Sequence, residues 1–181
     1  MALTKIRDAA LPAGSVLQVV QSVNKYQHSV AGAPDTDYVI QSASGTDWNP
    51  TISISANSKV LVNIMLSTST SSPDPFQLFK FQRSIDGGVW ANVDTGSANG
   101  SRTPVFAGYR IRAENNYGQL PLNLCYLDDP AQGSDCTVAY RIISRQGAGT
   151  TRISYFNYST ANDDEVGTYV STCIMQEIAD A

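Results

Sequence analysis

Short segments in which apolar and polar residues alternate follow one another along most of this chain, with turn residues between them. Lys59–Thr70 is the clearest of them, since Val60, Val62, Ile64 and Leu66 recur at every second position. Successive side chains point to opposite faces of a β-strand, so this period of two predicts a strand with one buried face. Phe76–Ile85 alternates in the same way, and Asp86-Gly87-Gly88 then predicts a tight turn. The pattern restricts the chain to β-sheets.

The composition agrees with this restriction. Val and Ile total 26 residues against 10 Leu, and β-branched side chains favour pleated sheets over helices. We expect an all-β fold of about ten strands, a two-sheet sandwich or jelly roll, with a polar loop over Ser29–Asn49. The expected strands are Val16–Tyr26, Thr51–Ser55, Lys59–Thr70, Phe76–Ile85, Val89–Val93, Val105–Arg112, Leu120–Leu127, Cys136–Arg145, Arg152–Tyr158 and Gly167–Ile178. Residues 1–14 are expected to form an arm, and residues 15–181 a single domain.

Size and charge exclude several classes of protein. A chain of 181 residues can bury a core without metal or disulfides. Its net charge of −4, without a basic run, argues against a nucleic-acid partner. Apolar stretches are far shorter than the about 20 residues that span a bilayer, and no secretory leader is visible, so we expect an intracellularly made protein without a membrane partner.

Residues that carry chemistry are few. There is one histidine, His28, and no nucleophile elbow, P-loop or dinucleotide-binding motif, so we expect no enzyme, no cofactor and no metal. The cysteines Cys125, Cys136 and Cys173 are expected to be small buried residues, with a Cys125–Cys136 disulfide as the alternative. Three acidic loops keep calcium open as a second alternative: Asp35 with Asp37, Asp128 with Asp129, and Asp163, Asp164 with Glu165.

Aromatic residues suggest both a core and an interface. Trp90 and most phenylalanines lie within strand patterns and are expected in the core. Tyrosine suits a subunit interface because its ring buries area while its hydroxyl tolerates a wet rim. On this ground Tyr126, Tyr140, Tyr155 and Tyr169 are candidate interface residues. The arginine pairs Arg110 with Arg112 and Arg141 with Arg145 are each expected to share one sheet face.

Several stretches, in order along nearly the whole chain, resemble a globular module of tailed-bacteriophage structural proteins. They are Ile6–Gln21 (IRDAALPAGSVLQVVQ), Asn57–Val62 (NSKVLV), Tyr126–Ala131 (YLDDPA) followed by Thr137–Tyr140 (TVAY), and Met175–Ala179 (MQEIA). The resemblance implies a jelly roll like that of tumour necrosis factor and C1q heads, a homotrimer on a virion, and no catalytic motif.

The resemblance leaves the position on the virion open. Family members commonly carry a long shaft before the head, whereas only 14 residues precede the first expected strand here. This departure favours a decoration protein on the capsid surface, in contact with the major capsid protein through Leu3, Ile6 and Arg7 of the arm. The alternative is a receptor-binding tip or tail-associated subunit that meets host surface glycans through loops carrying Trp48 and Tyr117.

Overall fold

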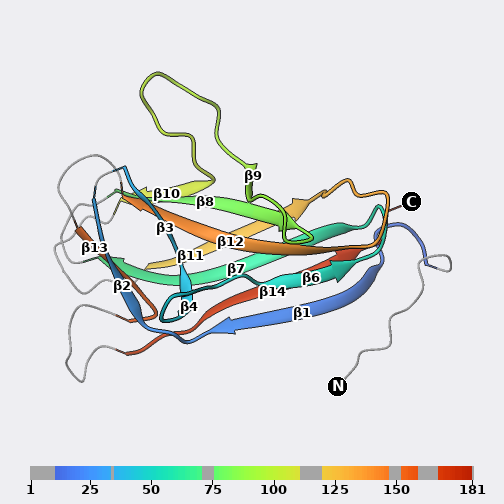
Figure 1. Ribbon diagram of the computed structural model, residues 1–181, viewed down its shortest axis with the longest axis horizontal. Helices are drawn as coiled ribbons and strands as arrows, with labels where there is room; N and C mark the ends of the chain where they lie inside the picture. Colours follow the sequence, from blue (N-terminus) through green and yellow to red (C-terminus); the bar gives the residue numbers. More distant parts are fainter. Residues whose placement is uncertain are drawn as a thin grey trace.

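The computed structural model describes residues 11–33, 35–70, 76–110, 120–146, 152–158 and 167–180, which contain fourteen strands in two large sheets and one small one (Figure 1). The strands are β1 (Val16–Asn24), β2 (His28–Gly32), β3 (Asp37–Val39), β4 (Gln41–Ala43), β5 (Thr46–Asp47), β6 (Thr51–Ile54), β7 (Lys59–Thr70), β8 (Phe76–Ile85), β9 (Ala91–Asp94), β10 (Ala107–Arg110), β11 (Leu120–Asp128), β12 (Cys136–Gln146), β13 (Arg152–Phe156) and β14 (Ser171–Ile178). No helix long and apolar enough to cross a membrane lies in these ranges.

The first large sheet, called sheet A here, is built around β7. One edge of β7 pairs with β11 along most of its length. Its other edge pairs first with β14 and then, beyond Ser67, with β13. Outside these two strands lie β1, paired with β14, and β2, paired with β13. The sheet is therefore four strands wide, with two of the four positions shared by two strands in succession.

The second large sheet, sheet B, has the same width. Its centre is the antiparallel pair β8 and β12. The free edge of β8 pairs with β10 and β9, and the free edge of β12 pairs with β3 and β6. The third sheet is only the small hairpin of β4 and β5.

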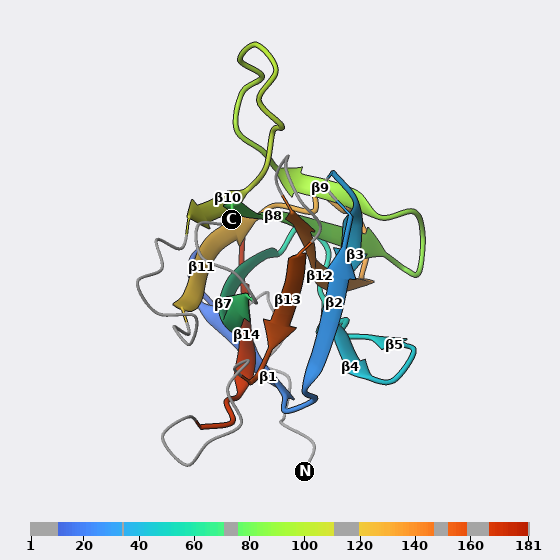
Figure 2. The ribbon, with the colours of Figure 1, turned by 90° about the vertical axis from the view of Figure 1, so that its left-hand side faces the viewer.

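The strand order is that of a jelly roll. Four positions hold two strands each: β1 with β2, β3 with β6, β9 with β10, and β14 with β13. When each position is counted once, the chain has eight: those of β1, β3 with β6, β7, β8, β9 with β10, β11, β12 and β14. Sheet A then reads first, eighth, third, sixth, and sheet B reads fifth, fourth, seventh, second. This alternation between two four-stranded sheets is the jelly-roll arrangement. Figure 2 shows the two layers end on.

The predicted all-β jelly roll is confirmed, with one difference in its strands. The described ranges hold fourteen strands and not about ten, because Ser29–Asn49 is not a loop: it contributes to β2, β3, β4 and β5. These strands are polar and lie at sheet edges, where backbone pairing holds them and little apolar alternation is required. The predicted turn after β8 is present, with positive φ at Asp86 and Gly87 and a hydrogen bond of 2.8 Å from Gly88 N–H to the Ile85 carbonyl.

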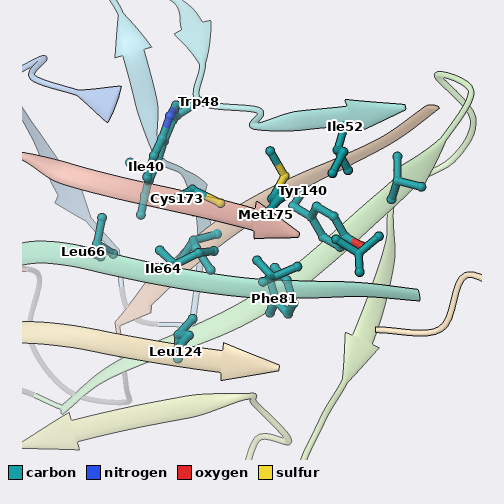
Figure 3. Close-up of a cluster of buried hydrophobic side chains, with 14 of the residues drawn as sticks. Ile40, Trp48, Ile52, Ile64, Leu66, Phe81, Leu124, Tyr140, Cys173 and Met175 are labelled. Carbon is teal, nitrogen blue, oxygen red and sulfur yellow. The ribbon is translucent and has the colours of Figure 1, made fainter. Parts of the chain in front are cut away.

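The two sheets enclose an apolar core. Figure 3 shows side chains of both layers meeting there, among them Ile64 and Leu66 from β7, Phe81 from β8 and Tyr140 from β12. The Phe81 and Tyr140 rings stack with their centroids 5.3 Å apart. Towards the other end of the sandwich the interior becomes polar, where the Tyr109 hydroxyl donates to Gln77 Oε1 at 2.6 Å and Gln146 Nε2 donates to Ser154 Oγ at 3.2 Å.

Candidate functional site

Apart from Lys59 at the start of β7, the outward side chains of the four paired strands of sheet A carry no charge. We call this surface the sheet A face. Its members are Val19, Gln21 and Val23 on β1; Thr172, Ile174 and Gln176 on β14; Leu61, Asn63 and Met65 on β7; and Asn123, Cys125 and Leu127 on β11. The nearest charged pair, Lys59 Nζ and Asp180 Oδ1 at 3.2 Å, lies where β7 begins.

Register places these residues in rows across the sheet, because directly opposed residues of antiparallel strands share a face. One row runs Val23, Thr172, Met65, Asn123, and the next runs Gln21, Ile174, Asn63, Cys125. Four apolar members are well exposed: Val19 by 45%, Val23 by 48%, Met65 by 43% and Leu127 by 52%. Exposed apolar residues gathered on one flat sheet face are typical of a contact surface.

Two hollows deepen this face, and Met65 lines both. The first, of about 240 Å³, lies along β7, β11 and β14 and includes Asn63, Cys125 and Ile174. The second, of about 500 Å³, continues past Ser67 and Pro121 to the segment Thr168–Val170 that leads into β14. A mostly apolar groove therefore runs along the middle of the face, where it can receive apolar side chains.

The outward surface of sheet B has the opposite character. Lys80 on β8 and Arg145 on β12 both contact Asp37 of β3, at 2.5 and 3.1 Å. Arg145 also contacts Asp35 at 3.2 Å. Exposed ion pairs of this kind add little stability, since water screens them, but they keep a surface hydrated. The molecule thus has one ionic face and one nearly charge-free face.

The four tyrosines predicted at an interface do not share one surface. Tyr155, which alternates with the buried Ser154 and Phe156 on β13, and Tyr169, which lines the larger hollow, lie on the outer side of sheet A. Tyr126 points inward, packs edge-on against Phe106, and donates its hydroxyl to Asp94 Oδ2 at 3.3 Å.

Tyr140 corrects the prediction. Its side chain is fully buried between the sheets, so within this fold it has no surface to offer a neighbour. Its hydroxyl donates to Asp128 Oδ2 at 2.9 Å, and burial together with the Asp128 charge raises the pKa of Tyr140 above its usual range. The alternation of Val138, Tyr140 and Ile142 on β12 is the signal that places it in the core.

The two tryptophans exchange the roles that were predicted for them. Trp48, expected in a loop that meets glycans, is 4% exposed, because its ring fills the core and its Nε1–H donates to Ser22 Oγ at 3.0 Å. Trp90, expected in the core, is only half-buried before β9, and the Arg141 guanidinium lies over its ring at 4.3 Å. Tyr117, the other predicted glycan contact, lies outside the described residues.

The predicted arm is described only at its end. Leu3, Ile6 and Arg7 lie outside the described residues. At the end of the arm, Gly14 N–H donates to the Ala179 carbonyl at 2.8 Å, which ties the entry to β1 against the end of β14.

Neither of the two described acidic loops is arranged for calcium. Asp35 and Asp37 bind Arg145, and Asp128 is buried and binds Arg83 and Tyr140. Asp163, Asp164 and Glu165 lie outside the described residues. Within the described ranges no group of three His, Cys, Asp or Glu side chains could hold a metal ion.

The cysteines and the histidine have separate environments. All three cysteines are free; Cys136 and Cys173 are buried as expected, whereas Cys125 is exposed on the sheet A face. His28 is buried between the rings of Tyr26 and Phe156, with ring centroids 5.6 and 4.8 Å away, and this burial lowers the pKa of His28 to about 4. His28 therefore lies inside the fold and does not open to solvent.

Comparisons with known proteins give a distant likeness in structure alone. No family model matches the chain, and no curated protein matches it. A structure of the Gt strain of infectious bursal disease virus aligns with a TM-score of 0.43 and 14% identity over 92% of this chain. The VP2 subviral particle of that virus aligns with a TM-score of 0.38 and 10% identity over 91% of this chain. This chain spans about two fifths of those chains, 39% and 42% respectively.

Proposed function

We propose that this chain is a non-enzymatic structural subunit of a virion, and that it acts as a trimeric decoration protein which stabilises the capsid by bridging its capsomers. The observation that carries this proposal is the nearly charge-free sheet A face on a jelly-roll body whose opposite face is ionic. A protein with one apolar face and one hydrated face is suited to an assembly in which the apolar face is covered and the hydrated face meets water. The resemblance to phage structural modules points to the same role.

The stabilising effect would be thermodynamic. A protein that binds the assembled shell and not its dissociated subunits shifts the equilibrium towards the shell by mass action. Threefold symmetry multiplies weak contacts, because after one subunit binds, the other two are held at high effective concentration. In this proposal the partner is the major capsid protein, the arm residues Leu3, Ile6 and Arg7 contact it, and the protein lies on the capsid surface after synthesis in the host cytoplasm.

Immunogold electron microscopy tests the proposal on intact virions of the virus that encodes this chain. Antibody against the chain is expected to label the whole icosahedral head. Label confined to the tail would overturn the decoration role, and absence of label from purified particles would overturn any virion role.

A second candidate is binding to host surface glycans, and Trp90 favours it. The Arg141 guanidinium lies over its half-buried ring at 4.3 Å, Arg141 Nε donates to Gln82 Oε1 at 2.9 Å, and Gln82 Nε2 donates to Asn92 Oδ1 at 3.0 Å. An aromatic ring with adjacent amides and a cation is a common way to hold a sugar ring and its hydroxyl or carboxylate groups. Binding of the wild-type protein on a glycan array, lost in Trp90→Ala, would support this candidate, and a blank array would remove it.

A further inference from the structure

We propose that Asn99 is a site of spontaneous chemical modification, at which the side-chain amide is lost as ammonia and the tip of a projecting hairpin changes its charge. The hairpin is the connection between β9 and β10, residues 95–106, and Figures 1 and 2 show that it extends away from both large sheets. The reaction needs only solvent water as a second reactant. This inference therefore does not depend on the proposed function.

The base of the hairpin is fixed to the sandwich, whereas its tip is open to water. Phe106 N–H donates to the Phe79 carbonyl at 2.9 Å, and the Phe106 ring packs edge-on against Tyr126 with the ring centroids 5.5 Å apart. Residues 96–102 are all exposed. The tip is thus held clear of the protein body, where water reaches each of its side chains.

The tip is a two-residue turn in which glycine directly follows Asn99. Arg102 N–H donates to the Asn99 carbonyl at 3.3 Å, and Gly100 has a φ of 60°, as the first central residue of a type II′ turn requires. The donor of this bond is Arg102, so the turn does not occupy the Gly100 nitrogen. The bond is longer than the usual range, so little opposes the backbone rotation at Asn99 that brings this nitrogen to the side chain.

The reaction joins the Gly100 nitrogen to Cγ of Asn99. The nitrogen gives up its proton as it bonds to Cγ, the Cγ–Nδ2 bond breaks, and Nδ2 leaves with that proton as ammonia. The product is a five-membered succinimide ring. Water then opens the ring: breaking the new bond to Cγ gives aspartate, and breaking the bond to the Asn99 main-chain carbonyl carbon gives isoaspartate.

Gly100 offers little hindrance to this attack, because it has no Cβ. Among the described residues, none besides its chain neighbours has an atom within 4 Å of the place where a Cβ of Gly100 would lie. Asn99 is the single asparagine of the sequence that precedes a glycine.

Two other asparagines show how the fold prevents the same reaction. Asn57 is also exposed, but the nitrogen that follows it, that of Ser58, donates to the Ser55 carbonyl at 3.2 Å, and Ser58 is buried. Asn157 is fully buried, and its Nδ2 donates to the Tyr26 carbonyl at 2.9 Å. The attacking nitrogen is occupied in the first case and the leaving amide in the second. Neither restraint is present at Asn99.

The modification changes the charge of the hairpin tip. Arg102 is the single charged residue among residues 95–106, and it is paired directly with Asn99 across the turn. A carboxylate formed at Asn99 therefore faces the guanidinium and cancels its charge. The net charge of the chain, −4 before the reaction, becomes more negative by one. Conversion thus removes the attraction of the tip to an acidic surface.

Mass spectrometry of the purified protein tests the proposal after several weeks at neutral pH and physiological temperature. The peptide that carries Asn99 is expected to gain the mass difference between an oxygen atom and an NH group, with isoaspartate as the main product. Isoelectric focusing of the same samples is expected to show one new, more acidic band. If Asn99 stays unchanged in the native protein, the inference is wrong.

Two variants assign the acidic band to its residue. Asn99→Gln is expected to show no such band over the same period, because its longer side chain would have to close a six-membered ring, which forms much more slowly. Asn123→Gln is the matched control: Asn123 is exposed on β11 and precedes the buried Leu124, and its variant is expected to behave as the wild type does. A band that persists in Asn99→Gln would overturn the assignment.

A parallel incubation in urea separates the effect of the fold from that of the sequence. Unfolding releases the Ser58 nitrogen, so Asn57 is expected to react several-fold faster than in the native protein. Asn99 is expected to react at a similar rate in both, because its turn is already open to water. Reaction of Asn57 as fast as Asn99 in the native protein would contradict the inference. A chain that is modified at Asn99 but absent from virions would contradict only the proposed function.

Discussion

Trp48 and Ser22 are joined by a hydrogen bond of 3.0 Å inside the sandwich, where the indole Nε1–H donates to the Ser22 hydroxyl. Trp48 follows the small β4–β5 hairpin, and Ser22 lies on the inner side of β1. The bond therefore ties an irregular segment of the chain to sheet A. It also satisfies the one polar group that the indole brings into an otherwise apolar site.

Removing the Trp48 ring is expected to destabilise the fold severely. Trp48→Ala leaves a cavity in the core and should lower the free energy of unfolding by about 3–5 kcal/mol. Ser22→Ala removes only the acceptor and should cost about 1 kcal/mol. Urea denaturation followed by circular dichroism measures both. Equal effects of the two substitutions would show that the hydrogen bond, and not the packing of the ring, dominates.

The group formed by the partly buried Arg83 and the buried Asp128 and Tyr140 predicts a graded loss of stability. Asp128 is 2% exposed and accepts a hydrogen bond from Arg83 through one oxygen and from Tyr140 through the other. Asp128→Asn leaves the Arg83 cation without its counter-charge and is expected to cost about 3 kcal/mol. Tyr140→Phe removes one hydrogen bond to a charged acceptor and is expected to cost about 1.5 kcal/mol.

Thermal or chemical unfolding of the two single variants and the double variant checks this order. Because both groups contact the same carboxylate, the double variant should lose less than the sum of the two single losses. Strict additivity would contradict a shared network.

The elements that the sequence predicted best are those with strict alternation. Lys59–Thr70 and Phe76–Ile85 were predicted with the bounds that the structure has, because a buried face with period two leaves no other register. Ser29–Asn49 was missed as strands, because edge pairing through the backbone needs no apolar pattern. The tryptophans were exchanged for a related reason: Trp48 lies among polar residues and Trp90 beside valine, and neither neighbourhood shows which side of the chain is covered.

The sequence predicts that the residues of the candidate site lie in strands, but it does not predict that their side chains gather on one surface. The residues of the sheet A face occur in predicted strands, yet an outward-facing Met65 or Ile174 looks like a core residue in sequence. Only the pairing of β1, β14, β7 and β11 shows that these side chains gather on one surface. Long-range register of this kind is set by packing between sheets, and a single sequence does not display it.

Stability is expected to fall in mild acid because of His28, the single histidine. The pKa of His28 is lowered from 6.5 to about 4 in the folded state, so between these values the unfolded chain binds more protons than the folded one. Stability therefore decreases as the pH falls from about 6.5 to about 4 and is not reduced further by this group below that. The difference of about 2.5 pKa units corresponds to at most about 3 kcal/mol.

The His28→Phe variant isolates this effect, because a phenyl ring can keep the stack with Tyr26 and Phe156 but does not titrate. The free energy of unfolding of both proteins should be measured at several pH values from 7 to 4. The gap between the curves is expected to move in favour of the variant as the pH falls. Parallel curves would show that His28 does not contribute to the acid sensitivity.

The three cysteines are expected to react in two classes. Cys125 is exposed, whereas Cys136 and Cys173 are buried. Burial raises the pKa of the Cys173 thiol to about 12, and burial with nearby carboxylates raises that of Cys136, so neither forms the reactive thiolate readily at neutral pH. A thiol reagent should therefore modify one cysteine per chain in the native protein and all three in denaturant. Modification of more than one cysteine in the native protein would contradict the burial of Cys136 and Cys173.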